Sequence, residues 1–142
     1  SMVHEFGHMI DDGSLSGIGG DYLSLKPDFD QIKEVYREHI DSIDMLKDKK
    51  GKYSADYYKN ATEIFARSFE MYVSKVLGVS NSLLGDLHSF EYPDGEEFMS
   101  MVKEYFDRLF KVLFYLFTKY SSYQVKKEYI VQIFLLLSFL DS

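Results

Sequence analysis

Hydrophobic residues recur every three or four positions along most of the chain, which is the spacing of one face of an α-helix. Over 96–120, one such stripe is formed by Phe98, Val102, Tyr105, Leu109, Leu113, Leu116 and Tyr120. We find no convincing β-strand pattern. The pattern therefore predicts an all-α fold with about five helices, over residues 4–12, 28–47, 57–78, 96–120 and 123–140.

Short turns separate these helices, the clearest being Pro93-Asp94-Gly95 before residue 96. A chain of 142 residues is long enough for one domain with a hydrophobic core and too short for two. We expect a single compact domain over 1–142, with the first helix in 1–12, another in 57–78 and the C-terminal helices in 96–140.

The last predicted helix is apolar on nearly all sides from Ile130 to Leu140. A membrane-spanning helix needs about 20 apolar residues, so we expect no membrane span here. Two interpretations remain for this run. It is either a helix buried in the core or a surface for docking a partner or another copy of the chain.

The composition narrows the possible partners. The formal net charge is −7 and the isoelectric point is about 5.0. Proteins that bind nucleic acids concentrate positive charge, so we expect no nucleic-acid partner. The chain has no cysteine, which excludes disulfides and thiolate metal ligands. No signal peptide is visible at its start, and its localisation stays open.

The first helix carries His4-Glu5-Phe6-Gly7-His8, which matches the H-E-x-x-H pattern. Side chains four residues apart lie on the same helical face, about 5–6 Å apart, so both imidazoles can reach one metal ion. Zinc suits imidazole ligands, and Glu5 lies where it can act as a general base on water. The alternative is two surface histidines on an acidic helix, because a five-residue match also occurs by chance.

A zinc site needs a third protein ligand, and Glu63 is the best candidate. It lies on the polar side of the predicted helix 57–78, near the small Ala66, which would let another helix approach closely. Two structural roles remain open for this carboxylate. Glu63 can complete a capping box with Asn60, or form an ordinary i,i+4 ion pair with Arg67 on a solvated face.

Two motifs in this order resemble those of a known family. His4 begins the stretch His-Glu-Phe-Gly-His-Met-Ile-Asp-Asp, and Glu63 begins Glu-x-Phe-Ala-x-x-Phe. Together they resemble the anthrax lethal factor-like zinc metallopeptidases, of the gluzincin type, and peptidase-like domains carried on large proteins of phages and mobile elements. The turn Pro93-Asp94-Gly95-Glu96-Glu97 extends the resemblance, which runs from His4 to about Leu116.

The resemblance implies roles for individual residues. It implies that His4, His8 and Glu63 hold Zn2+ and that Glu5 activates water for hydrolysis of a peptide bond. It also implies that Asp11 orients a ligand histidine, although Asp11 can equally be a surface acid at the end of its helix. Glu70 is a weaker candidate for the third ligand, because the family pattern places it one turn too late.

The resembled peptidases use a tyrosine to stabilise the oxyanion, seven residues before the ligand glutamate. Asp56 stands at that position here. We expect Tyr57, the nearest substitute, to take this catalytic role, with Tyr58 and Tyr53 as alternatives. Two further histidines, His39 and His88, each stand alone and are expected in surface or capping roles.

Two functions follow as hypotheses. The first is a zinc metallopeptidase, or its C-terminal catalytic portion, that acts on a peptide or protein substrate. The second is a non-catalytic helical interaction module derived from a peptidase of a mobile element or toxin. The resembled enzymes bind substrate along a strand before the first motif, and Ser1 to Val3 cannot supply one. We therefore expect weak activity from these 142 residues, and a larger bacterial host protein that is cytoplasmic or secreted.

Overall fold

Helices make up all the regular secondary structure in the described part of the chain, which comprises residues 1–14, 21–78 and 89–119 of a computed structural model, with side chains as far as Val112 in the last helix. The α-helices are Met2–Asp11 (α1), Asp30–Asp41 (α2), Ala55–Tyr58 (α3), Ala61–Met71 (α4) and Glu96–Lys119 (α5). Short 3-10 turns occupy Leu23–Leu25, Pro27–Phe29 and Asp44–Leu46, and a π-helical turn occupies Tyr72–Val76. The absence of strands from these residues confirms the predicted all-α fold.

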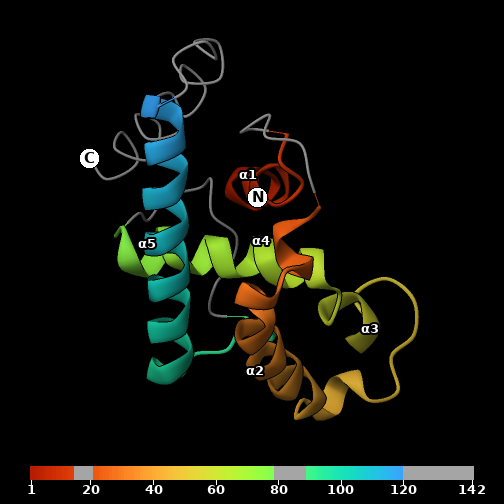
Figure 1. Ribbon diagram of the computed structural model, residues 1–142. Helices are drawn as coiled ribbons and strands as arrows, with labels where there is room; N and C mark the ends of the chain where they lie inside the picture. The colour runs from red at the N-terminus through yellow and green to blue at the C-terminus, as the bar shows by residue number, and fades with distance from the viewer. Residues whose placement is uncertain (15–20, 79–88, 120–142) are drawn as a thin grey trace.

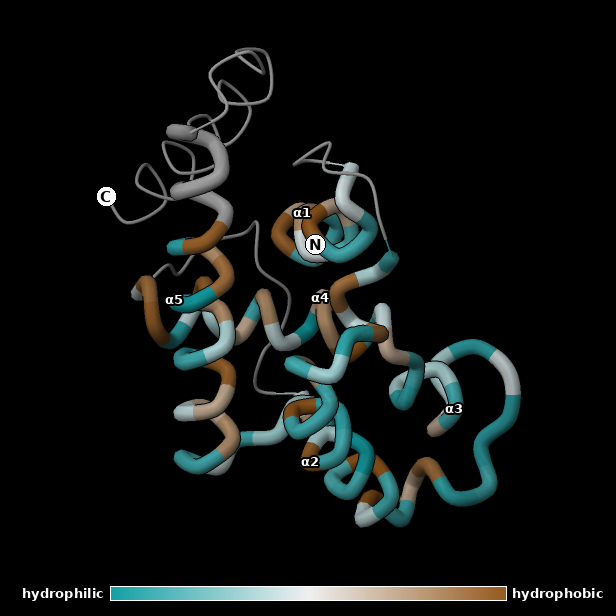
Figure 2. The backbone as a smooth tube through the Cα atoms, viewed as in Figure 1, coloured by the Kyte–Doolittle hydropathy of each residue, from teal (hydrophilic) through white to brown (hydrophobic). Residues whose placement is uncertain are grey.

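Helix α4 lies at the centre of the arrangement. In Figure 1 it runs across the molecule, with α1 seen end-on against it, α5 crossing near one end, and α2 below. Every residue of α4 from Glu63 to Met71 is buried as a result. In Figure 2 the part of the loop that leads into α3 is mostly hydrophilic and lies at the edge of the molecule.

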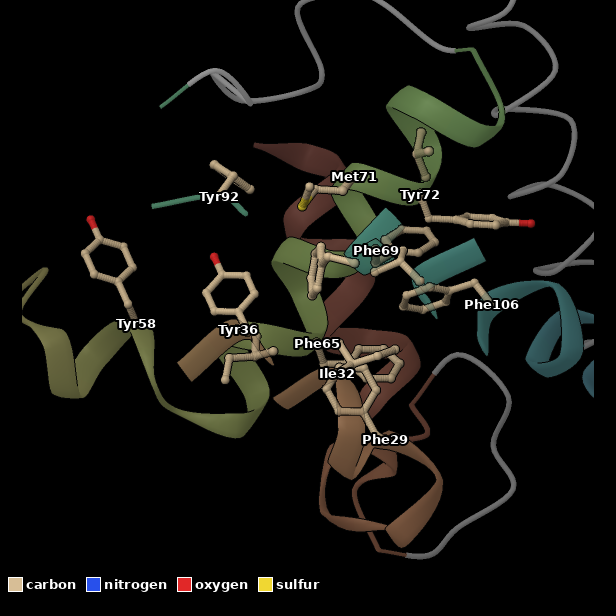
Figure 3. Close-up of a cluster of buried hydrophobic side chains, with 14 of the residues drawn as sticks. Phe29, Ile32, Tyr36, Tyr58, Phe65, Phe69, Met71, Tyr72, Tyr92 and Phe106 are labelled. Carbon is tan, nitrogen blue, oxygen red and sulfur yellow. The ribbon is translucent and has the colours of Figure 1, made fainter. Parts of the chain in front are cut away.

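Aromatic rings form the core on the apolar side of α4. Phe65 and Phe69 face Phe106 of α5, with ring centroids 5.4 and 5.7 Å apart, and Phe29 lies 5.1 Å from Phe65. All four side chains are almost fully buried, and Figure 3 shows them gathered between the helices. Burial of each such ring stabilises the fold by about 2 kcal/mol. This core fixes the orientation of α4 and leaves its polar side for α1.

Helix α2 is shorter than the predicted 28–47. It ends at Asp41, and Ile43 already has an extended backbone with ψ of 107°. The hydroxyl of Ser42 donates to the backbone carbonyl of His39 over 2.6 Å. The backbone N–H of Ser42 donates to the same carbonyl over 3.1 Å. Ser42 therefore closes the last turn of the helix with both of its polar groups, and this local bonding overrides the apolar periodicity.

The helix predicted over 57–78 is divided. Asn60 has an extended backbone, with φ −65° and ψ 131°, and its side chain accepts a hydrogen bond from Thr62 N–H as the N-cap of α4. The short helix α3 therefore stands apart from α4. The predicted end is confirmed at Gly78, whose φ of 73° lies in the left-handed region that favours glycine.

Helix α5 begins at Glu96, as predicted, and buries Phe98 and Val102. The predicted stripe then placed Tyr105 in the core. Phe106 is the fully buried ring instead, and Tyr105 is only half-buried. The buried face thus follows a strict four-residue spacing in the first turns of this helix.

The helix predicted over 123–140, with its possible docking surface Ile130–Leu140, lies outside the described residues. Among the helices that the structure does describe, none combines the length and apolar character needed to cross a bilayer.

Helices α1 and α4 touch through backbone atoms where Gly7 meets Ala66. A Cβ atom added at Gly7 would lie 2.8 Å from Ala66 Cα and 3.3 Å from its carbonyl oxygen. Only glycine allows this approach without movement of one backbone. The small residue expected to admit another helix does so here, and the facing residue is the glycine of the His4–His8 motif.

We predict that Gly7→Ala destabilises the protein by about 1–3 kcal/mol, because the added methyl group meets the α4 backbone and overpacks the crossing. In an open helix the same change would stabilise the protein by about 0.5–1 kcal/mol, because alanine favours the helix more than glycine does. The sign of the change in unfolding free energy therefore tells whether the contact with α4 or the helix propensity dominates. Urea unfolding measures the change. The control is Gly95→Ala, where an added Cβ meets nothing within 4 Å. A Gly7→Ala protein as stable as wild type would contradict the close crossing.

Candidate metal centre

Local capping places the candidate ligands on facing helices. The hydroxyl of Ser1 accepts a hydrogen bond from His4 N–H at the start of α1, over 3.1 Å. The cap at Asn60 begins α4 three residues before Glu63, which therefore lies in the first helical turn. His8 follows one turn after His4 on the same face of α1, since four residues span slightly more than one turn.

The imidazoles of His4 and His8 meet the carboxylate of Glu63 between α1 and α4. His4 Nε2 lies 3.2 Å from Glu63 Oε2, and His8 Nε2 lies 3.0 Å from Glu63 Oε1. The two Nε2 atoms are 3.1 Å apart. The structure thus brings together the three residues expected to hold a metal ion, with one ligand atom from each within 4.8 Å of the others.

Glu63 is engaged by the histidines and not by its helix cap. Its carboxylate does not reach back to Asn60, whose backbone N–H donates to the carbonyl of Tyr57 instead. The i,i+4 partner Arg67 is present, with Nε 3.5 Å from Glu63 Oε2, but both residues are buried, not solvated. Glu63 Oε2 still lacks a well-formed hydrogen bond among the described residues. A buried carboxylate oxygen in that state is suited to a cation.

Glu70 is the residue that sequence reasoning undervalued. Its Oε1 lies 2.7 Å from Nδ1 of His4 and also accepts a hydrogen bond from the hydroxyl of Tyr92 over 3.1 Å. Its side chain is only 2% exposed. A carboxylate on Nδ1 holds the proton there and leaves Nε2 as the free donor to a metal. The sequence shows only that Glu70 lies two turns after Glu63 on the same face of α4, and its contact with Nδ1 of His4 comes from the structure.

Asp11 is not the surface acid that the second interpretation expected. It is fully buried and accepts two hydrogen bonds from Ser24, from the backbone N–H over 2.6 Å and from the hydroxyl over 2.8 Å. Burial raises the pKa of Asp11, and the Ser24 hydrogen bonds oppose that rise. Asp11 therefore fastens the end of α1 to the turn that contains Ser24, while Glu70 contacts the ring of His4.

Of the three candidate tyrosines, Tyr57 is the one that interacts with Glu63 directly. Burial raises the pKa of the Tyr57 phenol, and the neighbouring Glu63 carboxylate raises it further. Tyr58 is buried with its ring 4.8 Å from the guanidinium carbon of Arg67, and Tyr53 is exposed. Glu5 is exposed on the first turn of α1.

His39 takes no part in this cluster. His39 donates from Nε2 to the backbone carbonyl of Phe90 over 2.8 Å, which ties α2 to the segment before α5. This contact fits the expected surface or capping role of His39. His88 lies outside the described residues.

Electrostatics favour charge on both partners of the His4–Glu63 pair in the metal-free protein. Burial disfavours a charged imidazole, but the carboxylates of Glu63 and Glu70 outweigh it and raise the pKa of His4 to about 9. Burial likewise disfavours a charged Glu63, yet hydrogen bonds from His4 and His8 lower its pKa well below the usual range. A cation at this position would replace the proton of His4.

Comparison with known proteins gives one family. Residues 49–117 match the large polyvalent protein-associated domain 1. The match contains α4 with Glu63 and Glu70 but not α1 with His4 and His8. It supports the expected relation to domains carried on large proteins of the phage type, and it names no peptidase. No curated protein and no solved structure matches the chain.

We predict that His4 in the metal-free protein titrates near pH 9, well above its ordinary value of 6.5. Because the folded-state pKa is the higher one, the stability from charged His4 is fully present below about pH 6.5 and lost as pH rises through about 9. NMR of the imidazole gives the pKa directly. The stability difference between wild type and His4→Gln should shrink from pH 6 to pH 10. A His4 pKa of 6.5 or lower would contradict this.

Proposed function

We propose that this protein is the zinc-binding core of a metallopeptidase-type hydrolase. The three distances among His4 Nε2, His8 Nε2 and the Glu63 carboxylate, 3.0 to 3.2 Å, carry the proposal. Ligand atoms about 2.0 Å from a tetrahedral zinc ion lie about 3.3 Å from one another. The two Nε2 atoms lie at nearly this distance, 3.1 Å, and each is 3.0 to 3.2 Å from a different oxygen of the Glu63 carboxylate. Hydrogen bonding alone does not explain all three contacts, since a proton shared between the two Nε2 atoms is not available to the carboxylate.

The charges around the site give independent support. The buried or nearly buried carboxylates of Glu63 and Glu91 pair with one guanidinium, that of Arg67, and the carboxylate of Glu70 pairs with the ring of His4. The imidazoles must be neutral to act as metal ligands, and in that state three negative charges and one positive charge leave a net charge of −2. Uncompensated buried charge is strongly unfavourable, and a divalent cation would balance this charge.

The donor set is of the catalytic kind. Two imidazoles and one carboxylate suit zinc, and the described residues supply three ligands where structural zinc sites have four. When bound, zinc supplies Lewis acidity, which activates water and polarises a substrate carbonyl group. The lethal factor-like resemblance assigns the same three residues to the metal.

The remaining residues of the site would move the protons. Glu5 would take a proton from the attacking water at its carboxylate and pass it to the leaving amine. The Tyr57 hydroxyl would donate a hydrogen bond to the negative charge that develops on the carbonyl oxygen. The raised pKa of Tyr57 suits this role, because it keeps the phenol protonated near neutral pH. The expected substrate is a peptide or protein.

The alternative is a non-catalytic helical module. The family match favours it in one respect, since residues 49–117 include Glu63 but exclude the helix with both histidines. On this alternative the chain would bind a partner and neither zinc nor hydrolysis would be needed.

We predict that the protein binds one zinc ion and that His4→Ala, His8→Ala and Glu63→Ala each abolish tight binding. Bound zinc should stabilise the fold by about 2.7 kcal/mol when free zinc is a hundredfold above its Kd, because the ion joins α1 to α4. Calorimetry and thermal unfolding with and without chelator measure the two effects.

The matched control is His39→Ala, which removes a histidine outside the cluster and should leave zinc binding unchanged. If the wild-type protein binds no zinc, or unfolds at the same temperature with and without chelator, the metal site is excluded. The non-catalytic helical module would then be the better explanation.

We predict that Glu5→Gln retains zinc but loses peptide cleavage by at least about a hundredfold, because a general base contributes on the order of 10² to 10⁴ in rate. Tyr57→Phe should lower kcat with a smaller effect on KM. Cleavage of a peptide library by zinc-loaded protein, read by mass spectrometry, provides the assay. Zinc binding without cleavage by wild type, in this chain or in any longer native form, would favour a structural metal site.

A further inference from the structure

The turn Ser89–Tyr92 is fastened to the residues around the candidate metal centre. The backbone N–H of Tyr92 donates to the carbonyl of Ser89 over 3.2 Å, and the Ser89 hydroxyl donates to Glu91. The carbonyl of Phe90 accepts from His39, as described above. These hydrogen bonds fix the backbone of the turn and therefore the directions of two of its side chains, Glu91 and Tyr92.

Tyr92 reaches one metal-ligand candidate through Glu70. Its hydroxyl donates to Glu70 Oε1 over 3.1 Å, and the same oxygen lies 2.7 Å from His4 Nδ1. Tyr92 is 8% exposed, so water competes little for this bond. A hydrogen bond to the oxygen that holds His4 restricts the rotation of the Glu70 carboxylate and hence the direction of the imidazole.

Glu91 reaches a second candidate through Arg67. Its Oε1 lies 3.4 Å from Arg67 Nη1, and Arg67 Nε lies 3.5 Å from Glu63 Oε2. The guanidinium is also held between two rings, 4.8 Å from Tyr58 and 5.1 Å from Tyr92. Its planar group thus has little freedom, and it meets the one Glu63 oxygen that lacks a well-formed hydrogen bond.

We infer that Tyr92 and Glu91 are positioning residues of the metal site, acting on His4 through Glu70 and on Glu63 through Arg67. This inference rests on the proposed function, in which those two residues are zinc ligands. One four-residue turn then sets the direction of two ligands from two different helices. The partners of metal ligands govern affinity because they fix ring orientation and tautomer before the ion arrives.

The chain offers matched controls for both residues. Tyr72 is a buried tyrosine whose hydroxyl donates to the carboxylate of Asp107 over 2.7 Å, away from the ligands. Tyr72→Phe therefore removes the same kind of bond as Tyr92→Phe. Glu104 pairs with Arg108 over 2.7 Å on an exposed face, so Glu104→Gln is the control for Glu91→Gln.

The test measures zinc affinity by chelator competition, the visible spectrum of the cobalt-substituted protein, and, by NMR without metal, the solvent-exchange rate of the His4 Nδ1 proton. We expect Tyr92→Phe and Glu91→Gln each to weaken zinc binding about fivefold, the effect of one hydrogen bond. The cobalt spectrum should change in both. The His4 Nδ1 proton, held by Glu70, should exchange faster in Tyr92→Phe, while Tyr72→Phe and Glu104→Gln behave as wild type.

A double-variant comparison separates positioning from general packing. Tyr92→Phe should have no further effect on zinc affinity in a Glu70→Ala background, because its route to His4 is already removed. Equal losses in both backgrounds, or equal losses in Tyr92→Phe and Tyr72→Phe, would overturn the inference. If wild type binds zinc tightly and the affinity is unchanged in Tyr92→Phe and Glu91→Gln, the inference about positioning is overturned and the proposed function stands. Wild type that binds no metal would overturn the proposed function with it.

Discussion

The contact between the α1 and α4 backbones at Gly7 and Ala66 sets the position of every group in the candidate site. The two histidines of α1 stand three residues before and one residue after Gly7. On α4, Glu63 stands three residues before Ala66 and Glu70 four residues after it. Because the polar groups flank a single crossing point, any separation of the helices would lengthen every distance between the histidines of α1 and the carboxylates of α4 together. A site of this kind needs small residues at the crossing more than it needs a large core.

The general fold could be predicted from the sequence because helical periodicity is a property of long stretches. The all-α class and the start of α5 are correct for that reason. The errors arise where one polar side chain competes with the backbone. Ser42 ends α2 early, and Asn60 divides the predicted helix 57–78. The pattern of apolar residues does not reveal these helix ends, because the free energy of a single capping hydrogen bond exceeds the helix propensities of several residues together.

The site was predictable only in part. His4, His8 and Glu63 could be grouped because motif spacing and the order of two motifs point to them. The role of Glu70 depends on which rotamer of His4 is held and on a tyrosine 22 residues later, and no local pattern contains that information. Asp11 shows the opposite case. It belongs to the recognised motif, yet burial and two hydrogen bonds direct it to Ser24.

The division of the helix at Asn60 also bears on the displaced tyrosine. In one continuous helix, moving a side chain by one residue turns it by about 100° and removes it from its face. Here Tyr57 belongs to α3 and Glu63 to α4, and the extended residue Asn60 separates their helical phases. The spacing of the two side chains is therefore free of the 3.6-residue rule. Under the proposed function, a tyrosine at 57 can therefore take the place that the resembled pattern gives to position 56, because the joint at Asn60 separates its helix from that of Glu63.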